Sequence, residues 1–159
     1  MQKVTILCVG KLKEKFYLEA CKEYQKRLGG YCKLTVTELS EEKLPQNPTQ
    51  GQIDQALARE AQAIRGKLPA GATLVAMCVE ARSAPARSWP SWWTSGPWAR
   101  ASTWCSSSGA PTVWTPPSRS RPAAPVHVPH DLPPPPARVM LLEQIYRSFK
   151  INEGSSYHK

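Results

Sequence analysis

Along the first 80 residues, apolar positions alternate between strand-like runs and helix-like stripes. Residues 3–10 and 72–80 are nearly continuous apolar runs, and residues 32–39 alternate between apolar and polar, as buried and half-buried strands do. Apolar residues recur at spacings of three and four over 14–28 and 53–68, the period of an amphipathic helix. The order β-α-β-α-β predicts an α/β fold with a mostly parallel sheet and a central third strand.

A further helical pattern lies near the end of the chain, in "ARVMLLEQIYRSFKI" at 137–151. Its apolar face is broad enough to predict burial on more than one side and an interface in a homodimer. The face comprises Val139, Leu142, Ile145, Tyr146 and Phe149. The polar tail that follows offers no apolar partners in its own sequence, so we expect Tyr157 and His158 to contribute little to stability.

The segment 81–136 breaks this pattern. It holds all six tryptophans, thirteen of the sixteen prolines, no lysine and one acid. Because proline interrupts helices and central strands, we expect this segment as written to be disordered and to provide no strand to the sheet. Functional alternatives are base stacking by the tryptophans, an RNA-tail fragment in "SRSRP", a polyproline ligand at 133–136, and a metal site. The metal ligands in that alternative are His127, His130 and Asp131.

A displaced reading frame explains the segment better, because tryptophan has a single codon, TGG. If the last base of each codon joins the first two bases of the next, Trp92–Trp93 reads as valine and Trp93–Thr94 as aspartate. The overlaps from Cys105 onward permit three large apolar residues and then a glycine loop, which is typical of a ligand-binding turn after a strand. A second displaced frame permits Met-Thr-Phe-Pro-His-His-Leu over 130–136. We therefore interpret 81–136 as out of frame, through a sequencing error or a mutation.

Composition bounds the remaining choices. A chain of 159 residues is long enough for one domain with a proper core. Its formal net charge of +9 favours an anionic partner. An odd number of cysteines without Cys-x-x-Cys spacing indicates free buried thiols in a reducing cytoplasm, with neither a metal site nor a disulfide framework. The five cysteines are Cys8, Cys21, Cys32, Cys78 and Cys105. No apolar run is long enough to span a bilayer, so we expect no membrane partner.

Four stretches outside the aberrant segment carry a resemblance to a known family. They are "VGKLKEKF", "EYQKRLGGYCKL", "LLEQIYRSFKI" and the terminal "YHK". They closely resemble the ribosomal large-subunit pseudouridine methyltransferase H family of the SPOUT superfamily. The resemblance covers 1–80 and 137–159 as written and implies a single SPOUT domain over 1–159, with a carboxyl-terminal trefoil knot and a homodimeric assembly.

The resemblance also implies an activity. It is transfer of a methyl group from S-adenosylmethionine to N3 of a pseudouridine in 23S ribosomal RNA, within the large ribosomal subunit or the 70S ribosome. The alternative is a catalytically dead remnant, or a non-enzymatic protein that binds RNA without a cofactor.

Site residues follow from the same resemblance. Arg138, Tyr157 and His158 match motif positions implied to contact RNA phosphate and to handle the target base, although Arg138 is equally suited to a structural ion pair. Met77 matches an apolar cofactor contact, or is an ordinary core methionine. The other implied cofactor-binding positions are Gly109 in the glycine loop, and His127, Val128, Pro129, His130, Asp131 and Leu132 in a second loop where no residue type is retained.

Overall fold

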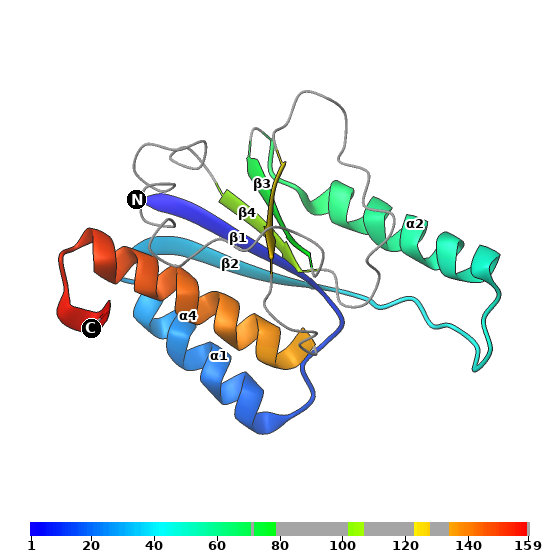
Figure 1. Cartoon of the computed structure of the whole chain (residues 1–159), viewed down its shortest axis with the longest axis horizontal. Helices are drawn as coiled ribbons and strands as arrows, with labels where there is room; N and C mark the ends of the chain where they lie inside the picture. The colour runs from blue at the N-terminus through cyan, green and yellow to red at the C-terminus, as the bar shows by residue number, and fades with distance from the viewer. Residues whose placement is uncertain (71, 79–101, 107–122, 128–133, 159) are drawn as a thin grey trace.

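The computed structural model describes residues 1–70, 72–78, 102–106, 123–127 and 134–158, which form a five-stranded sheet with helices on both faces (Figure 1). The amino-terminal part contains β1 (Gln2–Val9), α1 (Lys15–Leu28), β2 (Cys32–Leu39), α2 (Gln50–Lys67) and β3 (Thr73–Cys78). The remainder contains β4 (Ser102–Ser106), β5 (Ala123–His127), α4 (Pro134–Asn152) and the short 3-10 helix η2 (Ser156–His158). The α/β fold predicted from the sequence is confirmed.

All neighbouring strands of the sheet are parallel, in the order β2-β1-β4-β3-β5. The third strand was expected to be central; β3 is interior, with a neighbour on each side, but β4 holds the central position. Because the strands are parallel, their last residues meet at one edge, which we call the carboxyl edge. One row of register partners crosses all five strands there, and it consists of Glu38, Cys8, Ser106, Met77 and Val126.

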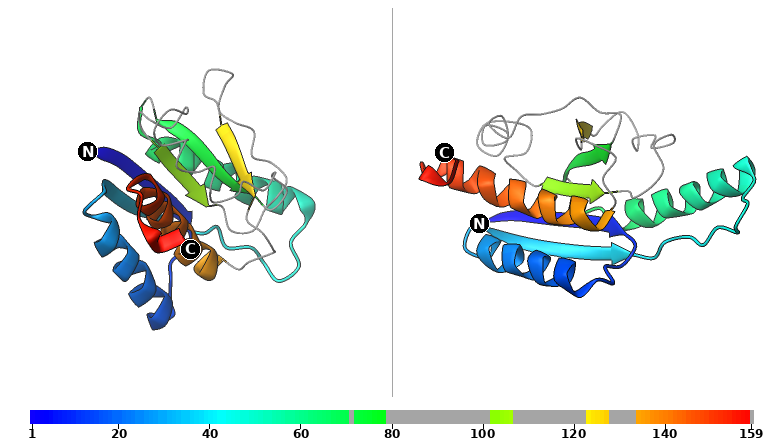
Figure 2. Two further views of the ribbon diagram at one scale, coloured as in Figure 1. Left: turned by 60° about the vertical axis from the view of Figure 1, so that its left-hand side comes forward. Right: turned by 60° about the horizontal axis from the view of Figure 1, so that its bottom comes forward.

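The two faces of β1 belong to two separate clusters of apolar side chains. Val4, Ile6 and Cys8 point to the face covered by α1 and α4. Leu7 and Val9 point to the opposite face, where Ile64 of α2 packs against them. This alternation is the period of two that a strand imposes on its side chains, and it makes the sheet the middle of three layers (Figure 2).

Helix α4 lies beside α1 on the same face of the sheet (Figures 1 and 2). Its residues Leu141, Leu142 and Ile145 are at most 2% exposed and belong to the same cluster as β1 and α1. The broad apolar face is therefore covered largely from within the chain. The inference that its breadth requires a second copy is wrong in this respect, and the homodimer itself stays a prediction.

The element boundaries differ from the expected ones for identifiable reasons. Helix α4 begins at Pro134, three residues early, because a proline in the first turn lacks only an N–H that would have no helical partner. Helix α2 begins at Gln50, before its first apolar position, because Thr49 and Gln52 form a capping box.

The expectation that 81–136 provides no strand is wrong for β4 and β5. The sequence of β4, STWCS, contains no proline, and its backbone completes ladders with β1 and β3. Strand β5 contains Pro125 but lies at the edge of the sheet, where a missing N–H donor is tolerated. Residues 79–101, 107–122 and 128–133 lie outside the described residues, and so does the path on which the implied knot depends. No helix among the described residues is long and apolar enough to cross a membrane.

Candidate functional site

The carboxyl edge brings together strand positions that the sequence assigned to cofactor binding. Met77 of β3 is in register with Ser106 of β4 and Val126 of β5, and Cys78 is in register with His127. The carboxyl ends of strands in an open parallel sheet are the common place for ligands to bind. The backbone therefore places Met77 and His127 at one edge, and their roles in cofactor binding stay predictions. Gly109 and 128–132 lie outside the described residues.

Arg138 ties the start of α4 to this edge. Its Nη1 forms an ion pair with Glu38 Oε1, and its Nη2 donates a hydrogen bond to the Gly10 carbonyl oxygen over 3.1 Å. The residue is 5% exposed, and a charge so deeply buried needs partners of this kind. This arrangement is the structural alternative that the sequence left open, and a contact between Arg138 and RNA phosphate stays a prediction.

Gly10 shapes the turn that offers its carbonyl group to Arg138. Its φ angle is +86°, a conformation that glycine adopts without steric cost, and its N–H donates to the Leu39 carbonyl over 2.9 Å. Glu38 was not singled out from the sequence. One signal in the sequence could have indicated it. Glu38 is an acidic residue one position before the end of an alternating strand whose first and last residues, Cys32 and Leu39, are buried.

Cys8 lies next to this ion pair, and its thiol stays protonated near neutral pH. Burial raises its pKa to about 11, an effect that the Arg138 charge opposes and the Glu38 charge reinforces. Because the thiolate is the reactive form, a thiol with this pKa is inert near neutral pH. Cys8, Cys21 and Cys32 are free and buried, so the prediction of buried free thiols is confirmed for these three.

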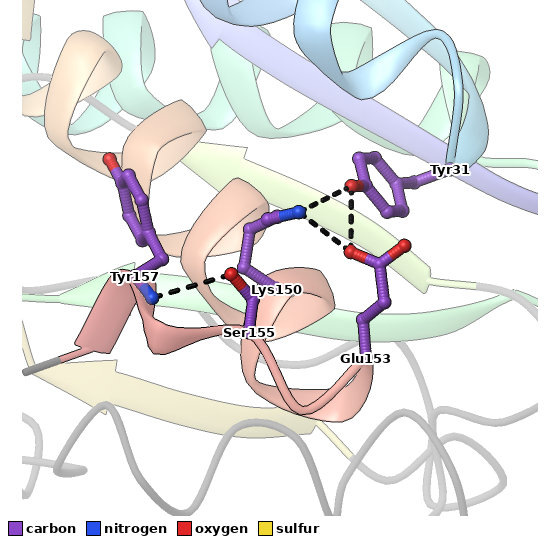
Figure 3. A network of polar contacts seen from close by, with 5 residues as sticks. All are labelled: Tyr31, Lys150, Glu153, Ser155 and Tyr157. Carbon is purple, nitrogen blue, oxygen red and sulfur yellow. Dashed lines mark hydrogen bonds and ion pairs between the residues drawn. The ribbon is translucent and has the colours of Figure 1, made fainter.

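A polar network fixes the other end of α4 (Figure 3). Lys150 Nζ donates to the Tyr31 hydroxyl oxygen over 3.1 Å and pairs with Glu153 Oε2 at 2.7 Å. The Tyr31 hydroxyl in turn donates to Glu153 Oε2 over 3.0 Å. These contacts hold the pKa of Glu153 below its usual value, chiefly through the bond from Lys150. The start of β2 and the end of α4 are thus fastened together.

The tail turns back along α4, because Gly154 adopts a φ angle of +74°. Tyr157 then packs edge-on against Tyr146, with ring centroids 5.3 Å apart, and its hydroxyl donates to Glu143 Oε1 over 3.5 Å. Burial, followed by the Glu143 charge, raises the pKa of Tyr157. The expectation that Tyr157 lacks apolar partners is therefore wrong. The backbone of His158 lies in η2, and its side chain is outside the described part of the chain.

The contacts of Arg138 and of Tyr157 lie at different places along α4, and the side chain of His158 is outside the described part of the chain. Arg138 lies in the first turns of a helix of 19 residues, which is about 28 Å long. Tyr157 contacts the middle of that helix from the tail. Among the described residues, no group of three or more His, Cys, Asp and Glu side chains is placed to hold a metal ion.

Comparison with known families adds one finding to this geometry. A family model described as "Predicted SPOUT methyltransferase" matches residues 2–95 and 125–158. The matched ranges contain β1, α1, β2, α2, β3, α4 and the tail. The matched ranges include 81–95 and 125–136, where the sequence alone showed no resemblance to the family. The unmatched interval, 96–124, lies entirely within 81–136.

Proposed function

Because the chain belongs to the SPOUT methyltransferase family, we propose that the protein, with its reading frame restored over 81–136, transfers the methyl group of S-adenosylmethionine to N3 of a pseudouridine in 23S ribosomal RNA. The observation that carries the methyltransferase assignment is the family match over most of the chain. The choice of substrate rests on the resemblance of the motifs at 9–16, 23–34, 141–151 and 157–159. The ribosome or its large subunit is the partner in this proposal.

The carboxyl edge is where we place the S-adenosylmethionine site in this proposal. The ends of β3, β4 and β5 lie side by side there through the register of Met77 with Ser106 and Val126. When bound, S-adenosylmethionine supplies a sulfonium-activated methyl group. Transfer of that group to N3 would leave S-adenosylhomocysteine, and the proton on N3 would pass to a base or to water. The protein's work is to orient the two reactants and exclude water.

A homodimer belongs to this proposal. Arg138 is held at the carboxyl edge, whereas Tyr157 contacts the chain further along α4. If both residues act on one target base, the tail of a second copy is the simplest way to supply Tyr157 and His158 to the edge that holds Arg138. Methylation is then expected to require the dimer.

We further propose that 81–136 comes from a displaced reading frame. The composition of the segment supports this reading throughout, and the gap in the family match supports it at 96–124, whereas the match at 81–95 and 125–136 does not. The chain as written then lacks the glycine loop that S-adenosylmethionine would need, and it would act as a remnant that binds RNA without cofactor. The frame-restored chain would be the active enzyme.

Calorimetry with S-adenosylmethionine on both chains tests the two readings. We expect the frame-restored chain to bind and to methylate ribosomes from cells that lack the modification, and the chain as written to do neither. Binding by the chain as written would overturn the displaced frame. A frame-restored chain that binds S-adenosylmethionine but leaves the pseudouridine unmethylated would overturn the substrate assignment. Resequencing of codons 80–137 provides an independent check.

A further inference from the structure

An aromatic side chain is exposed at the beginning of α1. Phe16 is 62% exposed, more than any large hydrophobic residue in the described chain except the initial methionine. Its ring lies 4.1 Å from that of Tyr17, centroid to centroid, at an interplanar angle of 44°. A phenylalanine in this position loses contact with water only if something else covers it.

Three exposed lysines precede this ring in the sequence. Lys11, Lys13 and Lys15 are all exposed. The ion pairs of the described residues include only Lys15 among these three, at 3.9 Å from Glu19 and with its side chain 91% exposed. A pair so distant and so exposed adds little stability, so these cations are available to an anionic partner.

The two faces of the sheet differ in charge. Residues 11–33, which contain α1, carry seven lysines and arginines against three glutamates. Residues 40–68, which contain α2, carry four cations and four carboxylates. The basic character of the amino-terminal part is therefore concentrated on the side of α1, and it favours a polyanion there.

The position of the segment connects it to the proposed reaction. Lys11 follows Gly10, whose carbonyl oxygen is held by Arg138 at the carboxyl edge. The segment thus leaves the sheet at the edge where Met77 is in register with Ser106.

We propose that Lys11–Phe16 is an RNA-docking element. Phe16 stacks on an unpaired base near the target, and Lys11, Lys13 and Lys15 contact the phosphates on either side. Stacking on an aromatic ring together with cationic contacts to the backbone is how proteins hold single-stranded nucleic acid. The proposal rests on the proposed function in taking RNA as the substrate, but it concerns binding alone and needs neither cofactor nor methyl transfer.

Fluorescence anisotropy of the full chain as written with a labelled single-stranded RNA tests this element without cofactor. We expect Phe16→Ala to weaken binding about fivefold or more and Phe16→Trp to restore it. Phe16→Leu should behave like alanine, because it keeps an apolar surface but removes the ring. Replacing Lys11 and Lys13 by Gln should lower the slope of log affinity against log salt by about 0.7 for each lost phosphate contact.

Matched controls come from the side of α2. Leu44→Ala removes a side chain that is 45% exposed, and Lys43→Gln with Lys67→Gln removes two exposed cations from the electroneutral region. Both should leave the affinity for RNA within about twofold of the parent chain. The melting temperature of each variant shows whether it is folded.

Three results would overturn the proposal. One is a parent chain that binds no RNA at low salt, and another is an affinity that does not depend on the ring at position 16. The third is a Phe16→Ala chain that changes from dimer to monomer in sedimentation while its RNA affinity stays unchanged, which would make the patch a protein interface. Methyl transfer by the frame-restored chain is measured separately, so failure of the proposed function is distinguishable from failure of docking.

Discussion

Arg138 and Glu38, which are one hundred positions apart in the chain, form an ion pair at the carboxyl edge of the sheet. The arginine side chain is 6% exposed and the glutamate side chain 32% exposed. Their contact joins the start of α4 to the end of β2, and the hydrogen bond from Arg138 to Gly10 adds the turn after β1. Three separate segments thus depend on one guanidinium group.

Removing the Glu38 charge should destabilise the protein, because it leaves a buried guanidinium without its counter-ion. We expect Glu38→Gln to lower the free energy of unfolding by about 2–3 kcal/mol, measured by urea denaturation. Glu42→Gln is the matched control, since Glu42 pairs with Arg59 at 3.3 Å on the surface and should cost less than about 1 kcal/mol. Equal losses in the two variants would show that the Arg138 pair has no special weight.

The turn at Gly10 should resist a side chain for conformational reasons alone. A Cβ at this position would meet only Glu41 Oε2, at 3.8 Å, which is ordinary contact, but the φ angle is +86°. We expect Gly10→Ala to cost about 1–2 kcal/mol of unfolding free energy. Gly66→Ala, in α2 with nothing within 4 Å of the new Cβ, should instead raise stability by about 0.5 kcal/mol. Thermal denaturation of the two variants separates these opposite signs.

Tyr157 offers a way to distinguish packing from chemistry. Tyr157→Ala should cost about 1 kcal/mol, because it removes the edge-on contact with Tyr146. Tyr157→Phe keeps that ring contact and loses only the contacts of the exposed hydroxyl, which are the 3.5 Å bond to Glu143 and a bond with Tyr24, so its melting temperature should stay close to that of the parent. If the hydroxyl handles the target base, methyl transfer by a frame-restored Tyr157→Phe chain should fall at least tenfold. Unchanged turnover would leave Tyr157 with a packing role only.

The buried thiols predict a loss of stability at alkaline pH. The pKa of both Cys8 and Cys32 is raised from 9.0 to about 11 by burial. Above pH 9 the unfolded chain releases these protons while the folded chain retains them, so the stabilising effect is complete below pH 9 and is lost between about pH 9 and 11. The loss should approach about 2–3 kcal/mol for each thiol.

Urea denaturation across this pH range measures the effect. Tyrosines and lysines also titrate there, so the relevant quantity is the difference between the parent chain and a chain with Cys8→Ala and Cys32→Ala. The double variant should be less stable at pH 8 and lose less stability up to pH 10.5. Parallel curves would show that ionisation of these thiols is not coupled to unfolding.

Local patterns predicted much of the fold. The alternation over 32–39 defines β2 to the residue, and the helical period over 14–28 predicts α1 to within one residue. Strand β4 could not be predicted in this way, because STWCS has neither an apolar run nor a clear alternation. Its strand conformation follows from its position between β1 and β3, whose backbone groups it completes, and context of this kind outweighs intrinsic preference.

Less of the site could be predicted from the sequence, because its contacts also depend on tertiary context. The resemblance marked Arg138, but no local pattern could pair it with a glutamate one hundred positions away. Tyr157 was judged by its polar neighbours in sequence, whereas its partner Tyr146 is reached only because Gly154 reverses the chain. Contacts between residues that are brought together by a distant segment or a chain reversal are visible only in the structure.

The packing of α4 against β1 and α1 has a consequence for synthesis of the protein. Val4, Ile6 and Leu28 emerge from the ribosome early, whereas Leu141 and Ile145, which close the same cluster, come near the end of the chain. A nascent or truncated chain that lacks α4 leaves one side of this cluster open to water, and such surfaces are where aggregation and chaperone binding begin. The amino-terminal half is therefore protected from chaperone binding and proteolysis only after α4 has been translated and has packed against this cluster.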